Sequence, residues 1–274
     1  MKILYTTDIH GRTHCFDTVL ERAAKAGASA IVYGGDLLPL GRDLFAVQQA
    51  FLENWLPDYI QRCAGRGITL LATLGNMDLR GLDGLFHQVM DSSGNSLSLL
   101  DESIGIGGYT FVGCAMTTDG PFSLKDRCLR DLPDSVSPFG GSDALVSGPD
   151  GIQQVDNWAR RVADLPSMAE HLNGLPRPEN PQRTVYVIHQ PPADTGLGII
   201  GNGVDVGSQA VTQFLERSDA LLSLHGHIHE SPFSGGTWRA SLGGTACVQP
   251  GQLSGENCVS VLIDLPDLKM ECQN

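Results

Sequence analysis

The stretch KILYTTDIHG at residues 2–11 sets an apolar run directly before an aspartate and a histidine. Short runs rich in β-branched and aromatic residues are typical of buried strands, so we expect residues 2–7 to form one. The same arrangement returns in ASAIVYGGD at 28–36 and in ITLLATLGNMD at 68–78. Each run predicts a buried strand that ends on a polar residue.

Two amphipathic segments separate these three strands. CFDTVLERAAKAG at 15–27 carries apolar residues at helical spacing, with Gly27 as its stop signal. A longer segment at 44–67 has the same spacing, and Pro57 is expected to bend or split it. Strands that alternate with helices indicate a parallel sheet with right-handed crossovers, and hence an α/β fold.

The middle of the chain departs from this alternation. Residues 97–117 are typical of short strands joined by a Gly-Gly turn, and residues 119–150 of a long surface loop rich in Pro, Gly, Ser and Asp. We expect residues 152–175 to be helical with an interruption near Pro166, and residues 176–183 to form a linker.

The last third resumes the regular pattern. Its apolar runs predict strands at 184–189, 219–229 and 258–265, with a helix at 207–218 between the first two. The second of these strands is expected to end on a cluster of histidines. We expect one domain over residues 1–274, in which residues 119–183 form an inserted loop and helical segment.

Seven candidate metal ligands lie where predicted strands pass into loops: Asp8, His10, Asp36, Asn76, His189, His227 and His229. The carboxyl ends of the strands are where ligands bind in open α/β sheets. Asp8 and His10 are two residues apart, as are His227 and His229, so in extended backbone the members of each pair point to one face. His225 would point the other way, either as a structural residue or as a support for a ligand. Mixed imidazole, carboxylate and amide donors suit Mn, Fe, Zn or similar divalent ions.

The blocks DIH, GGD, GNMD, HQPP and GHIH stand in the order typical of the calcineurin-like metallophosphoesterases, which this chain resembles over residues 3–264. The resemblance implies a four-layer α/β/β/α sandwich of two mixed sheets with helices outside. It also implies two metal ions, one held by Asp8, His10, Asp36 and His229 and the other by Asp36, Asn76, His189 and His227. Asp36 would bridge the two ions, and a metal-bridging hydroxide would attack a phosphoester. Asp36, Asn76 and His189 are therefore expected to be essential for turnover.

Met77 is the one departure from the family's pattern. Most members carry a histidine there, which protonates the leaving oxygen, and methionine cannot donate a proton. Asp78 then lacks its usual partner, and its alternative role is to cap the segment that follows it. Three outcomes stay open: the substrates have good leaving groups, another histidine such as His14 acts as the acid, or catalysis is weak. Arg12 is either a contact to a phosphate oxygen or an ordinary loop residue.

Composition limits the partners. The net charge is −13, and no run of basic residues occurs, which argues against long nucleic acid as a partner. Small anionic phosphoesters remain suitable, because a metal pair makes the site locally cationic. The seven cysteines include no C-x-x-C motif and suggest reduced thiols in a cytoplasmic protein. No signal peptide or apolar run long enough to span a membrane is visible, and the oligomeric state is left open.

We therefore expect a metal-dependent phosphoesterase that acts on phosphodiesters or activated phosphomonoesters. A catalytically weak metal-binding scaffold of the same fold is the first alternative. A nucleotide-pathway enzyme acting on small substrates such as cyclic nucleotides is the second, and a hydrolase of another ester class is the third.

Overall fold

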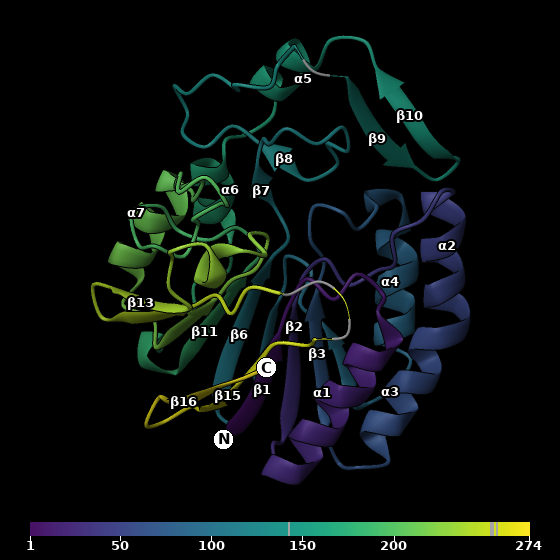
Figure 1. Ribbon diagram of the computed structural model, residues 1–274, viewed down its shortest axis with the longest axis vertical. Helices are drawn as coiled ribbons and strands as arrows, with labels where there is room; N and C mark the ends of the chain where they lie inside the picture. The colour runs from purple at the N-terminus through teal and green to yellow at the C-terminus, as the bar shows by residue number, and fades with distance from the viewer. Residues whose placement is uncertain (142, 253–254, 256) are drawn as a thin grey trace.

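Two six-stranded sheets form the centre of the computed structural model, which describes residues 1–141, 143–252, 255 and 257–274 (Figure 1). The first sheet has the order β16-β15-β1-β2-β3-β4. Its strands are β1 (Lys2–Thr6), β2 (Ala30–Gly34), β3 (Thr69–Thr73), β4 (Ser96–Ser98), β15 (Ser260–Asp264) and β16 (Lys269–Gln273). Strands β1 to β4 are parallel, as expected for the first three, and β15 and β16 add an antiparallel pair.

The second sheet has the order β13-β14-β12-β11-β6-β5. Its strands are β5 (Ser103–Ile106), β6 (Tyr109–Cys114), β11 (Thr184–Ile188), β12 (Leu222–Leu224), β13 (Arg239–Leu242) and β14 (Thr245–Val248). The four inner strands are parallel, and β5 and β13 pair antiparallel at the two edges. The expected turn at Gly107 and Gly108 joins β5 to β6, and both glycines have positive φ.

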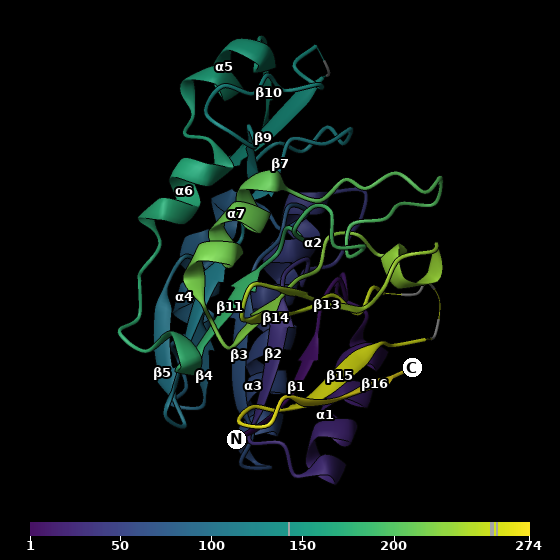
Figure 2. The same ribbon diagram turned by 90° about the vertical axis from the view of Figure 1, so that its left-hand side faces the viewer.

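Alternating side chains divide the molecule into four layers. In β1, Leu4 packs on the outside of the first sheet with α1 (Thr13–Ala26), α3 (Leu56–Ala64) and α4 (Asp83–Met90), whereas Ile3 and Tyr5 face the second sheet. In β11, Val185 and Val187 face the first sheet, whereas Tyr186 and Ile188 pack with α6 (Met168–Gly174) and α7 (Gln209–Ser218). Helices therefore cover both outer faces, as Figures 1 and 2 show, and the predicted α/β/β/α sandwich is confirmed.

Pro57 interrupts the long helix predicted at 44–67. The segment consists of α2 (Leu44–Ala50), a π-helical turn (Phe51–Trp55) and α3, with Pro57 in the first turn of α3. The backbone N–H of Leu56 donates to the carbonyl of Phe51, five residues earlier. Proline lacks an N–H, so a wider turn before it accommodates the missing hydrogen bond.

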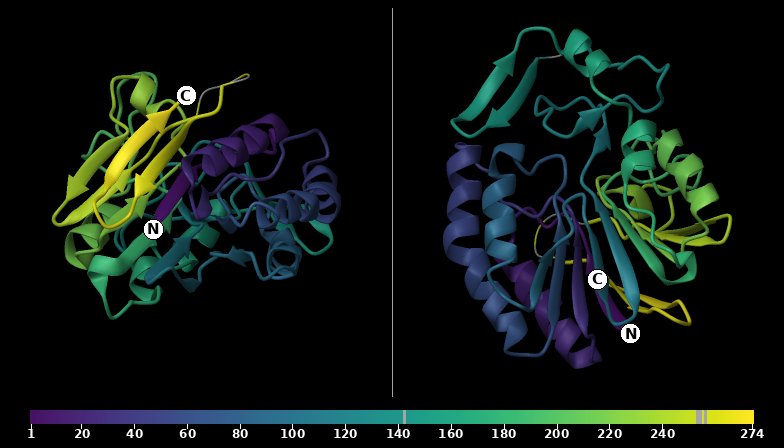
Figure 3. Two further views of the ribbon diagram at one scale, coloured as in Figure 1. Left: turned by 90° about the horizontal axis from the view of Figure 1, so that it is seen from below. Right: turned by 180° about the vertical axis from the view of Figure 1, so that it is seen from behind.

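A cap, which we define as residues 119–141 and 143–165, covers the carboxyl ends of the strands at the top of Figure 1 and in the right-hand view of Figure 3. It follows β7 (Thr117–Thr118) and contains β8 (Cys128–Leu129), β9 (Ala144–Gly148), β10 (Gly151–Val155) and α5 (Trp158–Asp164). Four buried residues form its own small core, namely Cys128, Ala144, Trp158 and Val162. A short 3-10 turn, Pro181–Arg183, then leads into β11.

Two predictions for this region are wrong. Residues 119–150 are not one long loop, because β8 and β9 lie within them, and residues 152–155 are strand rather than helix. The β9–β10 hairpin turns through Pro149 and Asp150, and Gly151, the first residue of β10, has a φ of 112° that favours glycine. The predicted break near Pro166 is confirmed, since α5 ends at Asp164 and α6 begins at Met168.

Strand ends also differ from the sequence patterns. The strand predicted at 219–229 spans only Leu222–Leu224, so the histidines lie in a loop rather than on the strand. Strands β13, β14 and β16 were not predicted.

All seven cysteines are free thiols, six of them buried. Within the described part of the chain, every helix is too short or too polar to cross a membrane.

Candidate metal centre

The candidate ligands follow five strands whose carboxyl ends meet at one edge of the sandwich. Asp8 and His10 follow β1, Asp36 follows β2, and Asn76 follows β3. His189 directly follows β11, and His227 and His229 lie in the loop after β12. The structure brings all seven side chains into one cluster, which consists of two groups of donors joined by Asp36.

The backbone that carries these ligands is left-handed rather than extended. Asp8, His10, Asp36 and His227 have φ values of 55°, 49°, 47° and 69°, and they make up half of the eight non-glycine residues described with positive φ. The extended geometry expected for the two ligand pairs is therefore wrong. Such conformations persist only where the surroundings over-determine them, and they gather at functional sites. Here hydrogen bonds between loops hold them, from Asp8 N to Gly35 O and from His10 N to Asp36 O.

The first group of donors contains Asp8, His10, Asp36 and His229. One donor atom from each lies within 4.8 Å of all the others. The Nε2 atoms of His10 and His229 are 3.2 Å apart, and His229 Nε2 is 3.4 Å from Asp8 Oδ1. Two imidazole nitrogens this close cannot both present lone pairs without a proton or a cation between them.

The second group contains Asn76, His189 and His227. The Oδ1 atom of Asn76 is 3.2 Å from His189 Nε2 and 2.7 Å from His227 Nδ1. His189 Nδ1 donates to the carbonyl of Gly34 at 2.8 Å, which directs its Nε2 toward the cluster. A histidine whose second ring nitrogen donates to a carbonyl is held in the orientation of a metal ligand.

Asp36 joins the two groups. Its Oδ2 lies 3.7 Å from His10 Nε2 in the first group, and its Oδ1 lies 3.6 Å from His189 Nε2 in the second. The side chain is buried, and the backbone N–H of Met77 donates to Oδ1 at 2.8 Å. One carboxylate thus presents an oxygen to each group of imidazoles.

Asp78 holds the two ligand loops together. Its Oδ2 accepts from the backbone N–H groups of Leu37 and Gly75 at 3.0 and 2.8 Å, and its Oδ1 accepts from Leu38 N at 2.8 Å. Burial and then the Asp36 carboxylate raise the pKa of Asp78 to about 7, against these three donors. Asp78 therefore has a structural task that does not depend on a histidine at position 77.

His225 supports His189 from behind. It is buried, and its Nδ1 lies 3.0 Å from the carbonyl oxygens of both Ile188 and Gln190, the two neighbours of His189. Carbonyls only accept, so Nδ1 donates to them. These contacts fit both interpretations open from the sequence, a structural residue and a support for His189.

Burial and neighbouring charges separate the titration of the imidazoles. Burial, followed by the nearby His189, lowers the pKa of His227 to about 4. Burial also lowers the pKa of His189, but the Asp36 and Asp8 carboxylates and the Gly34 carbonyl together raise that pKa to about 9. Burial lowers the pKa of His10 as well. His10 and His227 are therefore neutral at pH 7 and offer lone pairs, which is the form that binds metals.

Arg12 and His14 lie nearby, and their proposed roles are not tested by these contacts. The Arg12 guanidinium donates to three backbone carbonyls, those of Ile9, Gly255 and Asn257. Arg12 also lines a pocket of about 470 Å³ with Asp8, His10, His229, Glu230 and Phe233. His14 is exposed on α1, does not line this pocket, and places its Nε2 3.4 Å from Cys15 Sγ.

Two aromatic residues near the cluster were missed from the sequence. Phe122 of the cap lies edge-on to His227, with 5.7 Å between ring centroids. Phe233 is half exposed at the pocket beside His229. Phe122 stands in a segment rich in Pro, Gly and Ser and carries no local signal, whereas Phe233 is only four residues past His229.

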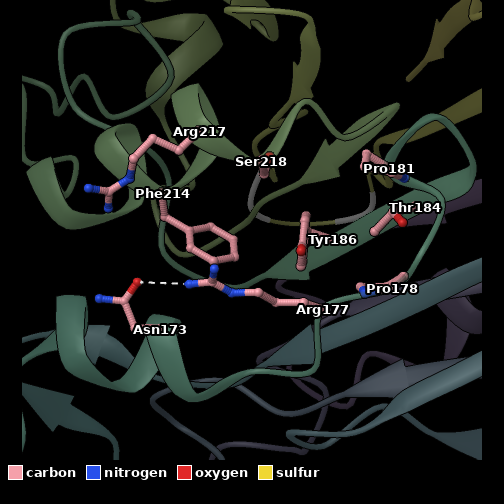
Figure 4. Close-up of a pocket in the computed structure, with 9 residues that line it drawn as sticks. All are labelled: Asn173, Arg177, Pro178, Pro181, Thr184, Tyr186, Phe214, Arg217 and Ser218. Carbon is pink, nitrogen blue, oxygen red and sulfur yellow. Dashed lines mark hydrogen bonds between the residues drawn. The ribbon is translucent and has the colours of Figure 1, made fainter.

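A second pocket of about 430 Å³ lies at the opposite end of β11, between α6 and α7 (Figure 4). Tyr186 and Phe214 form its apolar side, and Arg177 donates to Asn173 Oδ1 at 3.4 Å across it. It contains none of the candidate ligands. This pocket is therefore separate from the cluster of candidate ligands.

The donor set fits divalent cations. Carboxylate, imidazole and amide donors converge from five loops, and the buried His10 Nδ1 has no hydrogen-bond partner. Such mixed N and O donors are those that first-row divalent metals take in proteins. The fold and this cluster define the molecule as an α/β/β/α sandwich with a candidate Asp/His metal site.

The comparisons with known proteins agree with this class. The family model of calcineurin-like phosphoesterases matches residues 1–231, and the chain belongs to that family. No curated protein matches the chain. Among solved structures, TT1561 of Thermus thermophilus is 17% identical, with a TM-score of 0.60 over 100% of this chain and 98% of that one. A dimetal phosphatase from Danio rerio is 10% identical, with a TM-score of 0.54 over 100% and 95%. At these identities the two structures show likeness of fold alone.

Proposed function

We propose that this chain hydrolyses phosphoesters at a centre of two divalent metal ions. Asp8, His10, Asp36 and His229 would hold one ion, and Asp36, Asn76, His189 and His227 the other. The position of Asp36 carries the proposal, because its two oxygens face a histidine of each group at 3.7 and 3.6 Å. A carboxylate shared in this way is the usual bridge of a two-metal site.

When bound, the two ions supply Lewis acidity that activates water at neutral pH and neutralises charge on the phosphoryl oxygens. The chain's own residues hold the ligands in place. Met77 N–H orients Asp36, and the backbone N–H of His227 donates to both carboxylate oxygens of Asp8, at 3.0 and 3.1 Å. Because these donors belong to the backbone, the site does not depend on the side chain at position 77.

The substrate we propose is small and anionic, either a phosphodiester or a phosphomonoester with a good leaving group. The adjoining pocket of about 470 Å³ has the size of a small-molecule site, and Arg12 lines it. Mn, Fe or Zn would suit the mixed donors. The Danio rerio relative is described as a dimetal phosphatase, which supports the choice of two metals. The seven free thiols support a cytoplasmic location.

Met77 favours a second candidate, a metal-binding scaffold with weak catalysis. A general acid typically raises the rate by about 10²–10⁴-fold, and the methionine at position 77 cannot act as one. His14 is the proposed substitute, yet its Nε2 lies beside Cys15. The scaffold predicts bound metal without turnover, whereas the enzyme predicts both.

A metal-reconstituted assay against a panel of monoesters and diesters tests the proposal. Asn76→Ala and His189→Ala should abolish turnover, because each removes a donor from the second group. Asn95→Ala is the matched control, since Asn95 is exposed and outside the cluster. Full activity in either ligand variant contradicts the proposal, and bound metal without turnover of any ester favours the scaffold.

A further inference from the structure

A second cluster of metal-binding side chains lies outside the Asp8 centre. Asp101 follows β4, Cys114 ends β6, and His171 lies in α6. One donor atom from each lies within 4.8 Å of the other two, and His171 Nε2 is 3.5 Å from Asp101 Oδ1. The cluster shares no residue with the Asp8 group.

We propose that Asp101, Cys114 and His171 form a separate zinc site that fastens α6 to the ends of β4 and β6. Zinc binds cysteine sulfur at about 2.3 Å, and histidine nitrogen or carboxylate oxygen at about 2.0–2.2 Å, in tetrahedral geometry. Bonds of that length place neighbouring donor atoms about 3.3–3.7 Å apart. The 3.5 Å between His171 Nε2 and Asp101 Oδ1 falls within that range.

The orientation of His171 is the second observation behind the proposal. Its Nε2 is buried and faces Asp101 and Cys114, and its contact with Asp101 Oδ1 at 3.5 Å is an ion pair without the geometry of a hydrogen bond. The helix that presents it is firmly placed, because Ser167 and Glu170 form a capping box and Met168 N donates to Arg130 O. A divalent ion between the three donors would give this buried nitrogen the close partner that it lacks.

The charges balance when a divalent ion is bound. One thiolate and one carboxylate neutralise the two positive charges of zinc, so the partly buried site carries no net charge. Binding releases the Cys114 thiol proton to solvent, together with any proton on His171 Nε2. Without metal, burial lowers the pKa of His171, but its interactions with the facing Asp101 and Cys114 together raise that pKa to about 10. Metal-free protein therefore holds a His171–Asp101 ion pair instead.

The site has a path to solvent and a connection to the main centre. The Asp101 side chain is 40% exposed, which gives an ion access and leaves room for water as a fourth ligand. The carbonyl of Cys114 accepts from the backbone N–H of His189 at 3.0 Å. Zinc would thus join the segment after β4, the end of β6 and α6, next to β11, the strand that leads to His189.

Cobalt(II) titration of the metal-free full-length protein tests the proposal, because a thiolate bound to cobalt gives a near-ultraviolet charge-transfer band. The candidate ligands of the main centre contain no sulfur, so the band reports only cysteine. We expect a band intensity that corresponds to one cobalt-bound thiolate per chain. The band should be retained in Asp36→Asn, a variant in which the main centre is damaged. Asp101→Asn is conservative at an exposed position and should weaken the cobalt affinity by at least about 10-fold.

Cys114→Ser should abolish the band, and circular dichroism establishes that this variant folds. Cys15→Ser is the matched control, because Cys15 is another buried thiol with an imidazole nitrogen nearby, 3.4 Å away. The band should persist in that control. An absent band in the wild-type chain, a band that survives Cys114→Ser, or an affinity unchanged in Asp101→Asn overturns the zinc site.

Discussion

Lys125 carries a buried charge on which the cap depends. Its Nζ is enclosed and donates to Asp119 Oδ1 at 2.7 Å and to Gly120 O at 2.6 Å. The rings of Phe122, Phe139 and Trp158 surround it, with centroids 5.6–5.9 Å away. Removing one partner of a buried ion pair leaves an uncompensated charge and typically costs about 3–5 kcal/mol.

We predict that Lys125→Met destabilises the cap by about 3 kcal/mol, the low end of that range. Methionine replaces the apolar stem of lysine and packs well against rings, so the change removes mainly the ammonium group and its hydrogen bonds. Asp119 keeps two donors, Trp158 Nε1 at 2.7 Å and Ser137 Oγ, which limits the penalty. The open population of the cap should therefore rise by about 100-fold, since 1.4 kcal/mol is a factor of ten.

Hydrogen–deuterium exchange measures this directly, as a loss of protection confined to the cap. Lys269→Met is the matched control, because Lys269 and Asp267 form an exposed pair and should show no measurable change. Adding Asp119→Asn to Lys125→Met should restore most of the protection by removing the buried charge. Equal protection in Lys125→Met and Lys269→Met would refute the reasoning.

Three further predictions concern the centre and the cluster behind it. Met77→His should raise turnover of alkyl phosphoesters, because histidine can protonate the leaving oxygen. We expect a gain of about 10²-fold, the low end for a general acid, because both oxygens of Asp78, which would orient the histidine, already accept from backbone amides. Aryl esters should change little, Met77→Leu is the control, and an equal gain for both ester types contradicts the assignment. Chelation should lower the thermal midpoint of the wild-type chain more than that of Asp36→Asn, which keeps the Asp101 cluster but loses the shared carboxylate of the main centre, since a ligand at 100 times its Kd stabilises by about 2.7 kcal/mol; equal shifts in both would argue against Asp36 as a ligand. In chelator, His171→Gln should remove stability that is full below about pH 6.5 and lost toward pH 10, because the folded pKa is raised to about 10. We expect the free energy of unfolding to fall by about 1 kcal/mol, after discounting for the exposed Asp101. Urea unfolding of the wild-type chain and of His171→Gln measures this loss, and a difference between them that does not change with pH would count against the ion pair.

Much of the sandwich was predictable because strand and helix periods are local. The runs at 2–7 and 184–189 become β1 and β11, with lengths close to those expected. The hairpin at 144–155 was missed because its outer residues, such as Gln153 and Gln154, are exposed and polar. Its only clear signal was the Asp150-Gly151 turn. Edge elements of this kind carry little hydrophobic pattern, so periodicity does not reveal them.

The order and identity of the candidate metal donors could be predicted from the sequence, because they stand where apolar runs pass into loops and parallel strands share one edge. Only the tertiary structure decided which atoms meet. Left-handed turns at Asp8 and Asp36, hydrogen bonds between loops and the contact of Phe122 with His227 join segments far apart in the chain. The grouping of Asp101 with Cys114 and His171 arises in the same way. No local pattern specifies such contacts, because their geometry depends on how the two sheets and the cap pack together.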